Sequence, residues 1–150
     1  MRTRLLCMLI SFLLLCGCSA GETPYTVGDA QILLEAGLFN GDMGPVDKNI
    51  VSLLYGIDED TLQDCICYMA AGTASSADEL TILILTDADA ARLAQAACQK
   101  RIEDQIEASR NYAPAAVPRL ENAVIRRVGN TVLFAVGDPE RLSEAVDGLH

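Results

Sequence analysis

The sequence predicts an α+β fold in which a four-stranded antiparallel sheet packs against one long helix. Residues 87–112 repeat apolar side chains at helical spacing over an uninterrupted stretch. Two apolar runs at residues 62–69 and 79–86 precede that helix, and two more at residues 122–128 and 131–136 follow it. Because paired strands on either side of a helix favour antiparallel pairing, we expect the order ββαββα.

Two helices are expected before the sheet. Residues 27–39 space their apolar side chains as a helix does, and residues 47–55 form a second, shorter helix. Gly44 and Pro45 end the first helix, and Gly56 is a typical stop for the second. No strand is therefore expected between the two helices.

The later elements carry clearer local signals. Residues 80–85 are almost continuously apolar, which predicts a strand covered on both faces. Asp87 or Asp89 can cap the long helix. Gly129 and Asn130 suit the tight turn of a hairpin, and a final short helix ends the chain. The apolar stripe of the long helix consists of Ala91, Ala94, Cys98, Ile102 and Ile106.

Composition indicates one packed domain with an acidic surface. Of the 150 residues, 51% are hydrophobic, which is enough for a core, and the formal net charge is −10. Such a surface is repelled by nucleic-acid phosphates and by anionic lipids, so no nucleic-acid partner is expected. The simplest interpretation of the charge is solubility; the alternative is a site for cations or cationic partners.

Residues 1–17 are predicted to be a lipoprotein signal peptide. Arg2 and Arg4 give it a positive start, and residues 5–16 form an apolar run broken only by Ser11. A membrane-spanning helix needs about 20 apolar residues, so this run is too short to cross a bilayer.

The leader ends in Leu-Cys-Gly-Cys at positions 15–18, which resembles a bacterial lipobox. The resemblance implies that the Cys18 thiol receives a diacylglycerol and that a peptidase cuts before it. Acyl chains such as palmitate would then hold the protein on the extracytoplasmic face of a membrane, since each buried CH₂ contributes about 0.8 kcal/mol. Residues 18–25 are predicted to form the lipidated tether and residues 26–150 a single domain. The alternative is an ordinary secretory signal with chance cysteines.

The mature chain, from about Thr26 onward, resembles a family of bacterial extracytoplasmic lipoproteins known as domain of unknown function 4358. The resemblance implies a lipobox leader and this fold, and it supplies no catalytic residues. Cys65 and Cys67 depart from the pattern of that family. The resemblance rests on Leu54-Tyr-Gly-Ile, Tyr68-Met69, Ala77-Asp-Glu-Leu-Thr-Ile, Lys100-Arg-Ile-Glu-Asp-Gln105, Tyr112-Ala-Pro, Leu120-Glu-Asn-Ala-Val-Ile and Gly129-Asn-Thr-Val-Leu-Phe-Ala-Val.

Three cysteines of the mature domain form a candidate disulfide or thiol site: Cys65, Cys67 and Cys98. Cys65 and Cys67 lie two apart and share one face of a strand, and the stripe carrying Cys98 could pack on that face. A disulfide from Cys98 to either one is therefore a candidate. The favoured interpretation is three buried small side chains. No metal and no cofactor are expected, because the spacing is unlike a zinc site and His150 is the only histidine.

Charged clusters also have structural interpretations. The acids at residues 58–60, and Asp87 with Asp89, sit where turns and helix starts favour carboxylates, and they lack the calcium-loop pattern. Arg126 and Arg127 could bind an anion, but solvated positions on an edge strand are the simpler interpretation. Arg101 and Arg110 on the long helix are likewise expected to face solvent.

The sequence therefore predicts a non-enzymatic binding or interaction module. Nucleophile-elbow and phosphate-loop motifs are absent from the sequence, and no internal histidine can serve as a base. The expected partners are the membrane, through the anchor, and another envelope protein or a small extracellular ligand. The alternative is a thiol-based redox or metal-handling protein using Cys65, Cys67 and Cys98. An envelope hydrolase would need an acidic cleft around residues 58–60.

Overall fold

The computed structural model describes residues 23–71 and 77–150. Within them, one antiparallel sheet has the strand order β1–β2–β3–β5–β4. The strands are β1 (Met43–Pro45), β2 (Leu62–Ala70), β3 (Glu79–Leu85), β4 (Val124–Val128) and β5 (Thr131–Val136). The helices are α1 (Val27–Glu35), α2 (Lys48–Tyr55), η1 (Glu59–Thr61), α3 (Ala88–Tyr112), η2 (Pro114–Ala116), α4 (Val117–Glu121) and α5 (Leu142–Asp147). The leader and Cys18 lie outside the described residues.

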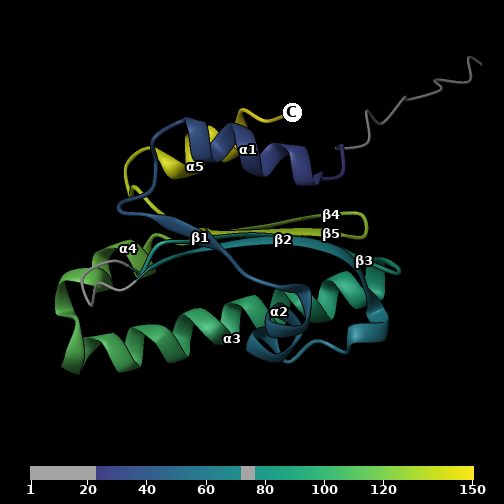
Figure 1. Cartoon of the computed structure of the whole chain (residues 1–150), viewed down its shortest axis with the longest axis horizontal. Helices are drawn as coiled ribbons and strands as arrows, with labels where there is room; N and C mark the ends of the chain where they lie inside the picture. Colours follow the sequence, from purple (N-terminus) through teal and green to yellow (C-terminus); the bar gives the residue numbers. More distant parts are fainter. Residues whose placement is uncertain (1–22, 72–76) are drawn as a thin grey trace, which may run out of the picture.

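Helices cover both faces of the sheet, giving three layers. Figure 1 shows α1 and α5 on one face, with α3, α2 and α4 on the other. The side chains of central strand β3 alternate between the layers: Leu80 and Ile82 pack toward α1 and α5, whereas Leu83 and Leu85 pack toward α3. This confirms the prediction of a strand covered on both faces.

Each face of the sheet has its own core. Phe134 is central to the core under α3, and Leu33 and Leu133 belong to the core under α1 and α5. Tyr25, which the sequence assigns to the tether, is 7% exposed, and its backbone N–H donates to Thr131 Oγ1 at 3.0 Å. Together the two cores draw on residues from Tyr25 to Leu149, so both lie within residues 23–150.

The predicted four-stranded sheet is wrong in its strand number, because the sheet has five strands. The unpredicted strand is β1, in which Met43 pairs with Ala70 and Pro45 pairs with Tyr68. It is too short to show a period, and its Gly-Pro sequence is typical of a helix stop. Proline is tolerated here because β1 is an edge strand, where a missing N–H breaks no inner ladder.

The predicted order ββαββα is inexact as well, because β1 precedes it and α4 follows α3, but the coarser predictions of the fold class are confirmed. The fold is mixed, the sheet is antiparallel, and the long helix extends from Ala88 to Tyr112. Asp87 caps this helix by accepting a hydrogen bond from the Ala90 N–H at 2.8 Å. The β4–β5 hairpin turns at Gly129, whose φ of 57° is easily reached only without a Cβ. The two N-terminal helices, however, pack on opposite faces of the sheet.

Candidate functional site

A groove runs between α3 and the facing segment of residues 53–61, which includes the end of α2 and η1. It consists of two adjoining hollows of about 370 and 480 Å³, which share Gly56 and Ala97 as lining residues. We call this feature the α2–α3 groove. Its α3 wall consists of Ala90, Leu93, Ala94, Ala97, Lys100, Arg101 and Asp104. Its other wall consists of Leu53, Leu54, Tyr55, Gly56, Ile57, Asp58 and Thr61.

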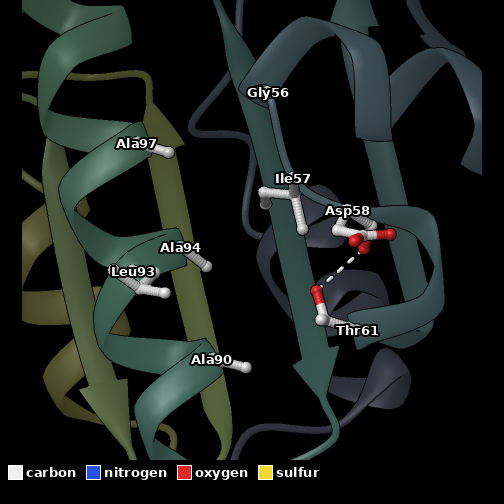
Figure 2. A pocket seen from close by; sticks show the side chains of 8 residues that line it. All are labelled: Gly56, Ile57, Asp58, Thr61, Ala90, Leu93, Ala94 and Ala97. Carbon is white, nitrogen blue, oxygen red and sulfur yellow. Dashed lines mark hydrogen bonds between the residues drawn. The ribbon is translucent and has the colours of Figure 1, made fainter.

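Small residues keep the groove open. Figure 2 shows Ala90, Ala94 and Ala97 pointing from α3 toward Ile57 on the opposite wall. Their methyl groups are too short to fill the space between the walls. Gly56 ends α2 in the left-handed conformation, with φ at 62°, which turns the chain along the second wall.

Exposed leucines border the groove on both sides. Leu53 on α2 is 75% exposed and Leu93 on α3 is 62% exposed, and both line it. Burying one such side chain stabilises a complex or fold by about 1.5–3 kcal/mol, which this conformation forgoes at both positions. A groove with unburied leucines on its walls and a mainly apolar hollow beside Ile57 is therefore able to bind an apolar surface.

One end of the groove is acidic. Asp58 lines it, and Glu59 and Asp60 follow on the exposed η1 turn. Asp89 is exposed beside Ala90 on the other wall, 3.8 Å from Arg92 Nε. The Asp58 side chain also accepts a hydrogen bond from the Asp60 N–H at 3.1 Å, so the predicted turn-capping role of this acid is confirmed.

A buried polar cluster forms the floor at the other end. Arg101 Nη2 lies 2.8 Å from Glu79 Oε2, and the two side chains are 13% and 1% exposed. The Tyr55 hydroxyl donates to Glu79 and lies 3.0 Å from Thr81 Oγ1, while the Arg101 guanidinium lies 5.3 Å from the Tyr55 ring centre. Burial raises the pKa of Tyr55, and the neighbouring Glu79 charge raises it further.

The expectation that Arg101 faces solvent is wrong. Arg101 follows Ala94 by seven residues and Cys98 by three, so it lies on the buried stripe of α3. Its guanidinium reaches into the sheet because the carboxylate of Glu79 is there to meet it. The helical spacing could have indicated this position, but the acidic partner, on a distant strand, could not be identified from sequence.

A second buried ion pair involves Asp78, the residue that precedes Glu79. Arg119 Nε on α4 lies 2.6 Å from Asp78 Oδ1, and the Asp78 side chain is fully buried. Asp78 also accepts a hydrogen bond from the Asn40 N–H, which ties the segment after α1 to the start of β3. Asp78 lies just before the apolar run that predicts β3, and no spacing in the sequence indicates its partner Arg119, which lies 41 residues away.

The candidate thiol residues are free thiols in this structure. Cys67 on β2 and Cys98 on α3 are fully buried in the core between the sheet and α3, while Cys65 is half-buried. Burial raises the pKa of both Cys67 and Cys98 from 9.0 to about 12, and it also raises the pKa of Cys65. Thiolates, the reactive and metal-binding forms, are scarce at neutral pH when the pKa is this high. The described residues contain no group of three His, Cys, Asp or Glu side chains placed to hold a metal ion.

The paired arginines of β4 have partners within the fold. Arg126 Nη2 lies 3.2 Å from Asp147 Oδ1 on α5, and Arg127 Nε donates to Gln95 Oε1 on α3 at 3.1 Å. Neighbouring residues of a strand point to opposite faces, so the two cations do not converge. Their position on the edge strand agrees with the structural interpretation.

The fold and the groove define a small α+β domain with a helical surface groove. The chain belongs to the family described as domain of unknown function 4358, whose model matches residues 36–137. Neither a curated protein nor a solved structure matches the chain. Among the helices of the described residues, none combines the length and apolar character required to cross a bilayer.

Proposed function

We propose that the protein is a lipid-anchored extracytoplasmic binding module and that the α2–α3 groove is its recognition surface. The observation that carries this proposal is the exposure of Leu53 and Leu93 on opposite walls of a groove whose hollow beside Ile57 is lined mainly by apolar residues. Recognition grooves of this kind bury apolar side chains of a partner and exclude water around them. The family match does not supply an activity, so the proposal depends on the site.

The anchor is proposed from the leader and its lipobox-like end at Cys18. Residues 18–24 can span at most about 25 Å when fully extended. The domain then begins at Tyr25, whose side chain is buried in the core under α1 and α5. We therefore propose that the α1–α5 layer faces the membrane and that the α2–α3 groove, on the other face of the sheet, points away from it (Figure 1).

Binding fits the groove better than catalysis does. Of the described residues that line the hollow beside Asp58, Asp58 is the one carboxylate, whereas glycoside hydrolysis by carboxylates uses a pair. The raised pKa values of Cys67 and Cys98 also argue against the thiol-based alternative. A binding role needs neither feature.

Affinity purification from solubilised envelope tests the recognition surface. The bait is the full-length protein, compared with the variant Leu53→Gln/Leu93→Gln. The matched control is Ile32→Gln/Tyr112→Gln, because these side chains are 56% and 86% exposed and lie away from the groove. We expect a partner to be retained by the wild type and the control and lost by the groove variant. Equal retention by all three proteins would contradict the proposal.

The anchor needs a separate test. We expect the intact mass of the protein purified from membranes to show a mature chain that begins at Cys18 and carries acyl chains. The Cys18→Ala variant should keep its leader and lose the acyl mass. An unmodified Cys18 in the wild-type protein would remove the proposed location while leaving the groove untouched.

A further inference from the structure

We propose that the α2–α3 groove binds a basic amphipathic helix of a partner protein. This inference rests on the proposed function and names the chemistry of the partner. Three properties of the groove support it: the helical nature of its walls, its length and small residues, and the placement of its charges.

The walls favour a helical partner over an extended one. Peptides that bind as strands pair with an exposed sheet edge through main-chain hydrogen bonds. The α2–α3 groove is bounded by α2, η1 and α3, whose main-chain groups largely bond within their own turns. Recognition must therefore come from side chains, and a helix offers a continuous row of apolar side chains at positions i, i+3, i+4 and i+7.

The size of the groove sets the size of the helix. The lining residues of α3 extend from Ala90 to Asp104, a separation of 14 residues, or about 21 Å at 1.5 Å per residue. A partner helix of about four turns matches this length. The partly exposed Ala90 and Ala97 let its axis approach that of α3 closely, at the short end of the usual 8–10 Å spacing. The apolar row of such a helix would bury Leu53 and Leu93.

The charges favour a basic helix. Asp58 lines one end of the groove, with Glu59 and Asp60 next to it on the exposed η1 turn, and the formal net charge of the chain is −10. The cations that line the other end, Lys100 and Arg101, are each paired with an acid, Asp104 and Glu79. Lys or Arg residues flanking the apolar row would meet this acidic end and speed association. The same charges disfavour a second copy of this chain and an anionic lipid surface, since both would bring like charge to the groove.

Model peptides test the inference with residues 23–150, which contain both cores. Three labelled helices of about 18 residues share one leucine row and carry Lys, Gln or Glu on their flanks. We expect the Lys peptide to bind at least about tenfold more tightly than the Glu peptide in fluorescence anisotropy, with the Gln peptide between them. Raising the salt from about 0.15 M to about 0.5 M should weaken the Lys peptide most.

Variants decide whether that binding occurs in the groove. Leu53→Gln/Leu93→Gln should weaken the Lys peptide about tenfold or more, because two apolar contacts are lost. Glu59→Gln/Asp60→Asn should weaken it about threefold or more, whereas Glu121→Gln/Glu140→Gln, which removes two exposed charges elsewhere, should leave it nearly unchanged.

Three results would overturn the inference. Equal affinity for the Lys and Glu peptides would remove the charge argument. Equal weakening by Glu59→Gln/Asp60→Asn and by the control Glu121→Gln/Glu140→Gln would show that the peptide is attracted to the acidic surface as a whole. Absence of peptide binding, combined with groove-dependent retention of an envelope protein, would overturn the basic helix as partner and leave the proposed function standing.

Discussion

Arg101 and Glu79 form a buried ion pair, with Nη2 and Oε2 2.8 Å apart, that joins α3 to the start of β3 beneath the α2–α3 groove. The pair lies against Tyr55 of α2, whose hydroxyl donates to the same carboxylate. Three elements that shape the groove are therefore held together by one polar cluster. Its integrity should govern both the stability of the domain and the shape of the groove.

Breaking this ion pair on one side should be costly. We expect Arg101→Met to lower the free energy of unfolding by about 3–5 kcal/mol, because it leaves Glu79 buried without its cation. Glu79→Gln should also destabilise the domain. The double variant should lose less than the sum of the two, since neither charge is then left alone. Urea unfolding measures all three, and strict additivity would contradict the interpretation.

The buried thiols predict a loss of stability in alkaline solution. Cys67 and Cys98 have folded-state pKa values of about 12, raised from 9.0 by burial, so the folded protein holds these protons where the unfolded chain releases them. Their contribution is complete below about pH 9 and is lost as pH rises toward 12, by up to about 1.4 kcal/mol per pH unit for each thiol. Unfolding measured between about pH 8 and pH 10.5 should show this slope.

The double variant Cys67→Ala/Cys98→Ala provides the control for that slope. It should be less stable at neutral pH, because two buried side chains shrink, yet its stability should fall less steeply above pH 9. The raised pKa of Tyr55 adds a slope of the same sign, so the fall should be reduced rather than abolished. An unchanged slope would show that these thiols do not stay protonated in the folded state.

Gly137 should tolerate no side chain. A Cβ at this position would lie 2.9 Å from the Leu38 carbonyl oxygen and 3.1 Å from the Phe39 ring. We expect Gly137→Ala to lower the free energy of unfolding by about 1–3 kcal/mol through steric strain. Gly28→Ala is the control, because Gly28 lies in the first turn of α1 with its nearest neighbour at 3.5 Å, and it should stabilise the fold by about 0.4–1 kcal/mol. An unchanged free energy of unfolding in Gly137→Ala would contradict the close packing of Gly137 against Leu38 and Phe39.

The two exposed leucines that border the α2–α3 groove should contribute little to the stability of the fold. Leu53 and Leu93 are mostly exposed, so Leu53→Gln and Leu93→Gln should each change the free energy of unfolding by no more than about 0.5 kcal/mol. Thermal unfolding should give nearly superimposable curves for the wild type and both variants. A large loss of stability would show that these side chains serve the fold rather than a partner.

Local sequence patterns predicted the elements whose apolar residues recur at helical or strand spacing. The long helix, the four longer strands and the turn at Gly129 followed from spacing and turn chemistry. The edge strand Met43–Pro45 did not, because three residues show no alternation and Gly-Pro indicates a break. Opposite placement of α1 and α2 depends on which sheet face each apolar stripe meets, and the sequence of either helix alone does not specify this.

The groove and its floor could be predicted only in part. Ala90, Ala94 and Ala97 lie on or beside the apolar side of α3, where alanine is also typical of close packing. Whether such a row is covered or open depends on the facing wall, which ends at Gly56. The pairing of Arg101 with Glu79, and of Arg119 with Asp78, joins residues far apart in sequence. No local pattern specifies contacts of that kind.

Site-specific photo-crosslinking in living cells tests most directly whether the α2–α3 groove is the recognition surface. A photoreactive residue replaces Leu93 in the full-length protein. In a second variant it replaces Ile32, which is similarly exposed and belongs to α1, a helix on the opposite face of the sheet. We predict a discrete covalent adduct with a partner protein from position 93 and none from position 32. Adducts of equal yield and pattern from both positions, or none from position 93, would contradict the account.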